Sequence, residues 1–277
     1  MANPLLNEKA MNKATQRGWA ASEADAGKTS HGVPVSDGLV GLSDGPIGPW
    51  TTGPTMTASG AATATLTLLA LLVAAATFGW SLVSEPTTGQ VQFPGWIFIG
   101  VIVGLVCAIG AMFRPQFARV LAPAYAIAQG VVVGAISRAY SIEYSGIVIQ
   151  AIGATLGVFV AMLVLYRTGI IKVNDKFRRI VSSAMLGLLL FYGISMIVSL
   201  FGANISFFNN ASPIGILFSL FVAGLAASNL ALDFDFIERG EKEGLPKQME
   251  WFAALGVLIT LVWLYLEILR LLSKLRD

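Results

Sequence analysis

Seven long apolar segments joined by short polar ones occupy the chain from about residue 60 onward. They lie at about residues 62–83, 94–113, 118–138, 147–166, 179–202, 213–237 and 249–272. At 1.5 Å per residue, a helix of about twenty residues crosses the roughly 30 Å hydrocarbon core of a bilayer. Because a bilayer offers no partner to an open backbone hydrogen-bonding group, these segments are predicted to be α-helices. The expected fold is an all-α bundle of seven transmembrane helices.

The composition supports a multi-pass membrane protein and argues against several other classes. Of the 277 residues, 55% are hydrophobic and only 12% are charged, whereas a soluble domain has about 25% charged residues. No basic cluster is interleaved with aromatic residues in the manner of a nucleic-acid site. The sole histidine, His31, lies in a polar stretch, so a Ser-His hydrolase or a His-ligated zinc site lacks its histidine. The single cysteine, Cys107, cannot form an intramolecular disulfide.

Residues 1–58 precede the first apolar segment and are rich in Gly, Ser, Thr, Pro and Ala. The stretch DGLVGLSDGPIGPWTTGPT has no sustained period, and its Pro and Gly residues interrupt any helix. No apolar stretch follows the early basic residues closely enough for a secretory signal peptide. We therefore expect a disordered tail over residues 1–58 and a membrane domain over residues 59–277.

The basic residues of the joints predict the orientation. The joints after the second, fourth and sixth segments carry Lys and Arg, whereas SEPTTGQVQFPG and FGANISFFNNASP carry none. The positive-inside rule then places the N-terminus in the cytoplasm. Seven full crossings would put Lys274 and Arg276 outside, a conflict that a shallow or incompletely crossing last helix would remove.

Three pairs of glycines four residues apart predict close helix packing. Such pairs let two backbones approach each other where lipid supplies no hydrophobic drive. They suit contacts inside the bundle or, alternatively, a dimer interface. The pairs are Gly100 with Gly104, Gly130 with Gly134, and Gly153 with Gly157.

Two aspartates, Asp233 and Asp235, close the sixth apolar segment in the stretch NLALDFDFIERG. Positions two apart on a helix differ by about 200°, so the two carboxylates cannot face the same neighbour. Asp235 has Arg239 four residues later, in the order that favours a surface ion pair. Asp233 instead has Asn229 one turn before it and Ile237 one turn after it. A carboxylate inside a bilayer normally finds a partner, a cation or a proton, so Asp233 is the stronger candidate for a functional acid.

The seventh segment carries two further acids, Glu250 and Glu267. A tight turn joins the sixth and seventh segments, so residues equally far from it lie at a similar depth. This relation puts Asp233 and Asp235 opposite residues 252–256, about one turn past Glu250. The expected acid cluster therefore consists of these two aspartates and Glu250, with Glu267 nearer the opposite face.

Three stretches in the membrane part resemble the Bax inhibitor-1/YccA family. They are LAPAYAIAQGVVVGAIS, NLALDFDFIE and MEWFAALGVLITLVWLYLEILRLL. The resemblance covers about residues 60–277 and points to a bacterial branch with a polar N-terminal extension. It implies a seven-helix bundle with the last helix near its centre. It also implies a proton-sensitive calcium leak, gated in characterised relatives by an acid pair on the sixth and seventh helices.

The resemblance implies roles for particular residues. Asp233 matches the acid of the sixth helix. The acid of the seventh helix has two candidate positions, because the LYLE block aligns Glu267 with it, whereas the ending at residues 269–270 aligns Thr260 with it. If Thr260 holds that position, either Glu250 takes over the second acid's role or the pore is not gated by pH.

Two more residues are connected to the proposed gate through the same resemblance. Gln129 stands where the family often has an acid, and Arg114 resembles a basic residue that latches the acid pair from the cytoplasmic side. Calcium prefers oxygen ligands, so Asp233 with Asn229 is the expected transient Ca²⁺ contact. No resident cofactor is expected.

Three functional hypotheses follow for a protein of the bacterial cytoplasmic membrane. The first is a pH-sensitive leak channel for calcium or another cation. The second is a non-transporting regulator that binds a membrane protease or another complex through its tail and helix surfaces. The third, an intramembrane aspartyl protease, is disfavoured because Asp233 and Asp235 share one helix and no Gly-x-Gly-Asp sequence supplies a partner acid. The chain is therefore not expected to be an enzyme.

Overall fold

The computed structural model of the chain describes residues 54–83, 95, 97–200 and 212–277. Most of the predicted tail, residues 1–53, lies outside these described residues. The same holds for most of the two predicted joints without basic residues, over residues 84–94 with 96 and residues 201–211.

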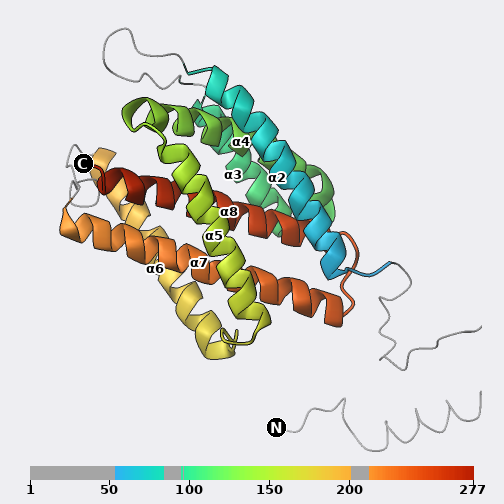
Figure 1. The fold of residues 1–277 in the computed structure, drawn as a ribbon. Helices are drawn as coiled ribbons and strands as arrows, with labels where there is room; N and C mark the ends of the chain where they lie inside the picture. The colour runs from blue at the N-terminus through green and yellow to red at the C-terminus, as the bar shows by residue number, and fades with distance from the viewer. Residues whose placement is uncertain (1–53, 84–94, 96, 201–211) are drawn as a thin grey trace, which may run out of the picture. The chain divides into compact units, whose positions relative to one another are not determined.

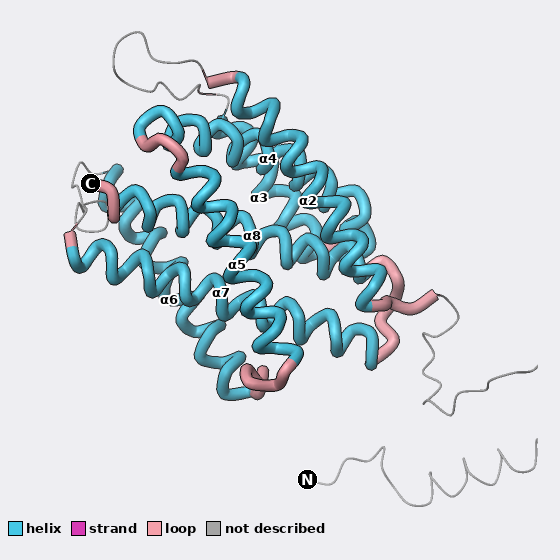
Figure 2. The backbone as a smooth tube through the Cα atoms, viewed as in Figure 1, coloured by secondary structure: helices cyan, strands magenta, loops and turns pink. Residues whose placement is uncertain are grey.

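Helices make up almost all of this part of the chain (Figures 1 and 2). The described helices are α2 (Ala58–Ser81), α3 (Ile97–Phe113), the 3₁₀ helix η1 (Pro115–Phe117), α4 (Ala118–Glu143), α5 (Ile147–Arg167), α6 (Asp175–Leu200), α7 (Pro213–Lys242) and α8 (Met249–Lys274). Six helices are long and apolar enough to cross a membrane, and α3 is a shorter apolar helix of 17 residues. The predicted all-α membrane fold is therefore confirmed.

Local sequence explains several of the helix boundaries. Thr57 caps α2 by accepting a hydrogen bond from the backbone N–H of Gly60, and Ser212 caps α7 in the same way ahead of a proline. The turn between α7 and α8 contains Gly244 at a φ of 65°, a left-handed conformation that other residues rarely adopt. This glycine lets the two helices reverse direction within a few residues.

The last helix, α8, lies at the centre of the bundle. It runs between α7 and the α2–α4 pair, and α5 crosses over it (Figure 1). In its most apolar stretch of 18 residues, 72% of α8 is buried inside the bundle, whereas only 12% of the corresponding stretch of α6 is buried. The expected central position of the last helix is confirmed, and α8 contributes more buried side chains to the main core than any other described helix.

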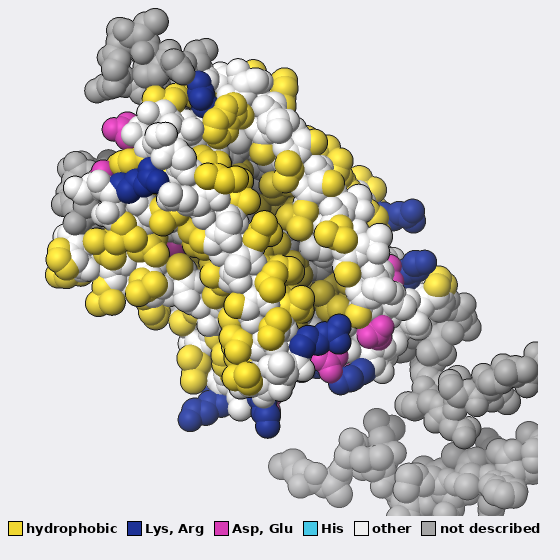
Figure 3. Space-filling model, viewed as in Figure 1, with side chains coloured by type: hydrophobic (Ala, Val, Ile, Leu, Met, Phe, Trp, Pro, Cys, Tyr) yellow, Lys and Arg dark blue, Asp and Glu magenta, His cyan; other side chains and the backbone are white. Residues whose placement is uncertain are grey.

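Large apolar side chains cover the outside of the bundle. Phe98, Met112 and Ile149 are each about 70% exposed, at 69%, 74% and 70%. On the face in Figure 3, hydrophobic side chains spread over the middle while Lys and Arg side chains lie toward the ends. An apolar girdle between two charged ends is the surface that a lipid bilayer covers.

Hydrogen bonds between elements define two ends of the bundle. At one end, Thr57 at the start of α2 contacts Glu250 at the start of α8. At that same end, Tyr166 of α5 donates to Glu238 of α7 at 2.5 Å. At the other end, the start of α7 meets the end of α8 through Lys274, which donates to the backbone oxygen of Gly215.

Basic residues near the end of α8 have partners at that second end. Lys274 is buried and also donates to Ser219 Oγ at 2.9 Å. Arg276 donates to the backbone oxygen of Ser145 at 2.8 Å and to Gln150 Oε1 at 2.9 Å. With 26 residues, α8 is about 39 Å long, which is enough to cross the roughly 30 Å hydrocarbon core of a bilayer.

Two of the three glycine pairs lie at helix contacts. A Cβ on Gly134 would be 2.7 Å from the carbonyl carbon of Ala76 in α2, and Gly100 lies against Val132 of α4. For Gly153 and Gly157, no atom of another described helix lies within 4 Å of the position that a Cβ would take. The expected packing inside the bundle therefore holds for the pairs in α3 and α4, and the pair in α5 faces open space.

Candidate functional site

Asp233 lies where α7 packs against α8. Its side chain is half-buried, and its Oδ1 atom lies over Gly256 of α8, 3.6 Å from the position that a Cβ would take. The Oδ2 atom is buried, and none of the described residues gives it a hydrogen-bond partner. An oxygen of a buried carboxyl without a partner is costly, and it marks the place where a proton or a cation can bind.

Two neutral polar side chains accompany this carboxyl. Asn229, one turn before Asp233 on α7, donates from Nδ2 to Thr260 Oγ1 on α8 at 2.8 Å. The Thr260 hydroxyl also faces the Asp233 carboxyl. Because this hydroxyl accepts from the amide, its own proton is free to point toward Asp233. The site thus offers carboxylate, amide and hydroxyl oxygens, which are the ligand types that Ca²⁺ accepts.

Asp235 points away from this site, as its position on the helix predicts. Its Oδ2 atom accepts from Arg178 of α6 at 2.7 Å and also pairs with Arg239 one turn later on α7. The pair with Arg239 was expected from the spacing. Arg178 could not be identified from the sequence, because 57 residues separate it from Asp235. Two cations satisfy Asp235, so it joins α6 to α7.

Glu250 contacts α2 instead of Asp233. Its Oε1 atom accepts from Thr57 N at 3.1 Å and from Thr57 Oγ1 at 3.0 Å, and the side chain is only 6% exposed. Six residues of α8 separate it from Gly256, which corresponds to about 9 Å along the helix. The structure therefore does not bring together the three expected acids, which contact α8, α6 and α2 respectively.

Glu267 belongs to a second polar cluster, two turns of α8 beyond Thr260. It is 3% exposed and pairs with Arg270 at 3.0 Å. Its Oε1 atom has no hydrogen-bond partner within the described part of the chain. Two cations, Arg270 and Lys274, lie on the following turns of the same helix, and Ser219 faces it from α7. This set, Ser219, Glu267, Arg270 and Lys274, is called the distal cluster below.

The remaining two candidates lie away from the acids. Arg114 is exposed between α3 and η1, and its side chain makes no hydrogen bond or ion pair with any described residue. Gln129 is half-buried on α4, and its amide lies against Gly104 of α3. Neither side chain contacts Asp233 in this conformation.

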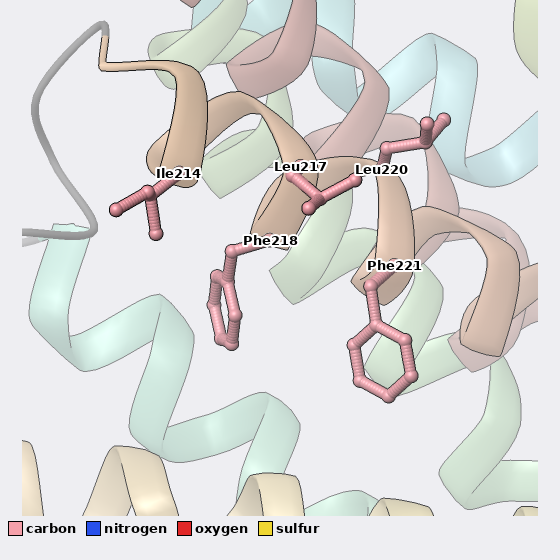
Figure 4. Close-up of a pocket in the computed structure, with 5 residues that line it drawn as sticks. All are labelled: Ile214, Leu217, Phe218, Leu220 and Phe221. Carbon is pink, nitrogen blue, oxygen red and sulfur yellow. The ribbon is translucent and has the colours of Figure 1, made fainter.

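No compact set of metal ligands occurs among the described residues. No group of three or more His, Cys, Asp or Glu side chains in that part of the chain could hold a metal ion. A pocket on α7 is lined by hydrocarbon side chains alone, which offer nothing to an ion (Figure 4). They are Ile214, Leu217, Phe218, Leu220 and Phe221.

The comparisons with known proteins support the resemblance found in the sequence. The family model described as Bax inhibitor 1 like matches residues 3–277. The chain belongs to this family. The search of individual curated proteins gave no match. The match to the Bax inhibitor 1 like family includes every helix and every candidate residue described above. The protein is a multi-pass membrane protein.

The geometry distinguishes between the two positions that the resemblance allowed for a second acid. Thr260 faces the Asp233 carboxyl across the α7–α8 contact, whereas Glu267 lies about 10 Å farther along α8. Thr260 is thus the α8 side chain opposite Asp233. This chain has one carboxyl and one hydroxyl at the place where the resemblance implies two acids.

Proposed function

We propose that the protein is a pH-sensitive leak channel for calcium or other cations, and that Asp233 is its working acid. The observation that carries the proposal is the buried Oδ2 atom of Asp233, which no described residue satisfies at the α7–α8 contact. An ionised carboxylate in such a place is unfavourable unless a cation accompanies it. The site therefore alternates between binding a proton and binding a cation.

The neighbours of Asp233 support a mechanism in two states. In the protonated state, the Asp233 carboxyl hydrogen-bonds with Thr260 and Asn229 and holds α7 against α8. At higher pH the carboxyl loses its proton, and its negative charge attracts water and a cation to the contact. Thr260 carries no charge and Glu250 contacts Thr57 instead of Asp233, so neither supplies a second titrating acid. Asp233 alone can still gain and lose a proton, and one proton therefore controls this step in place of an acid pair. Asp235 stays paired with Arg178 and Arg239 in both states, so its role is structural.

Calcium flux into proteoliposomes between pH 6 and pH 8 tests this proposal. The natural chain is expected to conduct more as the pH rises, and Asp233→Asn is expected to lose that dependence because the amide cannot titrate. Glu243→Gln, an exposed acid of the α7–α8 turn, is the matched control and should keep the natural curve. An unchanged pH–flux curve in Asp233→Asn would rule out this acid as the sensor.

The regulator hypothesis has its own outcome in this experiment. If folded protein gives no flux above empty liposomes at any pH, the leak proposal fails. The protein is then better explained as a non-transporting partner of another membrane protein, such as a protease. In that case the buried acid would act in packing alone, and deleting residues 1–53 would abolish capture of the partner.

We further propose that the protein lies in a bacterial cytoplasmic membrane with its N-terminus in the cytoplasm. The basic joint between α5 and α6 and the basic turn between α7 and α8 belong to the end of the bundle where α2 begins. A common end for these basic segments supports the orientation that the positive-inside rule predicts.

A further inference from the structure

Met56, in the segment just before α2, is almost completely buried at 1% exposure. Its sulfur atom lies close to Gly240, where a Cβ would be only 2.7 Å away, so the missing side chain makes room for it. Met56 belongs to an apolar cluster whose other side chains come from α2, α7, α8 and the turn between the last two. They are Ala61, Ile237, Leu245, Met249 and Ala253.

Met56 packs against the same face of α7 that carries Asp233. Positions 233, 237 and 240 are separated by four and then three residues, so Asp233, Ile237 and Gly240 line one stripe of α7. The ends of this stripe are seven residues apart, or about 10 Å.

The facing stripe of α8 repeats this relation. Thr260, Gly256, Ala253 and Met249 follow one another at spacings of four, three and four residues. Thr260 and Gly256 face Asp233, and Ala253 and Met249 pack against Met56. The two stripes together are called the seam below. Asp233 lies about 10 Å along the seam from Gly240, and Met56 packs at the end of the seam nearest the α7–α8 turn.

Backbone hydrogen bonds hold the segment that carries Met56. Met56 N donates to the oxygen of Leu245 at 2.7 Å, and Lys247 N donates to the oxygen of Pro54 at 3.0 Å. Between these two bonds, Thr55 and Pro246 form an antiparallel bridge. Residues 54–57 are called the clasp below, because they fasten the start of α2 to the turn.

Two carboxylates extend the clasp to both helices of the hairpin. Glu241 at the end of α7 accepts from the backbone N–H of Ala58 at 3.0 Å. Glu250 at the start of α8 accepts from Thr57. Both acids lie at the N-terminal end of α2, where the helix dipole favours negative charge. The ends of α7 and α8 that border the seam are therefore tied to one common point.

We propose that Met56 is an apolar plug of the cation path, and that the clasp must open before water and ions can reach Asp233 from the α7–α8 turn. An apolar constriction blocks ions because it excludes water. A methionine suits this task because its side chain is flexible and can leave without moving a helix. The inference rests on the proposed function, since it names the gate of the same path.

A disulfide across the clasp tests whether it must open. Thr55 and Pro246 are a non-hydrogen-bonded antiparallel pair, whose Cα atoms are about 4.5 Å apart in such bridges, within reach of a disulfide. Thr55→Cys with Pro246→Cys is built in a Cys107→Ala background, which removes the only native thiol. At pH 8 the oxidised variant is expected to lose most of its calcium flux and to regain it with a reducing agent. The single-cysteine variants should respond to neither treatment.

A second measurement does not depend on ion flux. Ala253→Cys places a thiol in the seam next to the plug, and its reaction with a small water-soluble thiol reagent reports water access. Met56→Ala is expected to speed this reaction about tenfold, because labelling of a buried thiol follows the population of the open state. Met56→Leu should restore the slow rate. Leu258→Cys, buried outside the seam, should stay slow in every variant, which excludes general loosening.

The two measurements separate failure of the plug from failure of the leak. If the background conducts and the double variant gives equal flux when oxidised and reduced, the plug inference is overturned and the leak proposal still stands. If the Cys107→Ala background does not conduct calcium, the leak proposal fails. The labelling of Ala253→Cys then still tests whether Met56 keeps water out of the seam. If Ala253→Cys is labelled at the same rate with Met56 as with Met56→Ala, the inference is overturned.

Discussion

At the scale of single residues, the contact between Asp233 and Thr260 determines how the site responds to protons. Thr260 faces the carboxyl and accepts a hydrogen bond from Asn229. A second acid at this position would share the buried space with Asp233. Like-charge repulsion then favours one proton held between two carboxyls, and a higher pH is needed to remove it.

Thr260→Asp is therefore expected to shift the midpoint of the pH–flux curve upward by about one pH unit or more. Thr260→Asn adds a polar group without a titratable proton and should leave the midpoint where it is. Glu267→Gln should not move the midpoint either, because Glu267 lies two helical turns away in the distal cluster. Flux measured from pH 6 to pH 9 checks all three. If only Glu267→Gln moves the midpoint, the sensor belongs to the distal cluster instead.

The neighbours of a side chain could be predicted from the sequence where the geometry of a single helix determines them. They could not be predicted where the neighbour comes from a distant part of the chain. The 200° between Asp233 and Asp235 correctly predicted that the two carboxylates face different neighbours. The partner of Glu250 could not be found in the same way, because Thr57 is 193 residues away and precedes the first apolar segment. Depth along the α7–α8 hairpin placed Glu250 near the correct level, but depth carries no information about which neighbour a side chain faces.

At the scale of helices, glycines set how closely α2 and α4 approach. The Cβ positions of Gly130 and Gly134 fall on the backbone of α2 near Leu72 and Ala76. Spacing alone predicted three such contacts. It could not tell that the α5 pair faces open space, because a small-residue pattern does not say whether a partner helix is present.

Gly134→Ala is expected to destabilise the bundle, because its methyl group has no room unless α2 shifts. Overpacking of this kind costs about 1–3 kcal/mol. Gly157→Ala is the matched control: it makes the same substitution on a helix of the same bundle, where nothing lies within 4 Å, so little change is expected. Thermal unfolding of both variants in detergent compares them. Equal stability of the two would mean that α2 and α4 do not pack through this glycine.

At the scale of the whole molecule, polar contacts assign three of the described connections between helices to one of two ends. The turn between α7 and α8 and the joint between α5 and α6 share one end with the start of α2, and the turn between α4 and α5 shares the other with the end of α8. The sequence predicted the helices and this alternation, because long apolar runs and basic joints are local signals. The clasp, the distal cluster and the partners of Lys274 required the folded chain.

Single cysteines in the Cys107→Ala background test this two-ended arrangement. With the N-terminus in the cytoplasm, a membrane-impermeant thiol reagent added to intact cells should label Ser145→Cys at the α4–α5 turn. It should leave Lys172→Cys and Glu243→Cys unlabelled until the membrane is permeabilised. The reverse pattern would be consistent with the same fold in the opposite membrane orientation. Labelling of all three cysteines from outside would contradict helices that cross the membrane in alternating directions. Only the first result puts the clasp and the mouth of the seam on the cytoplasmic side, where the proton concentration of the cell interior would act on Asp233.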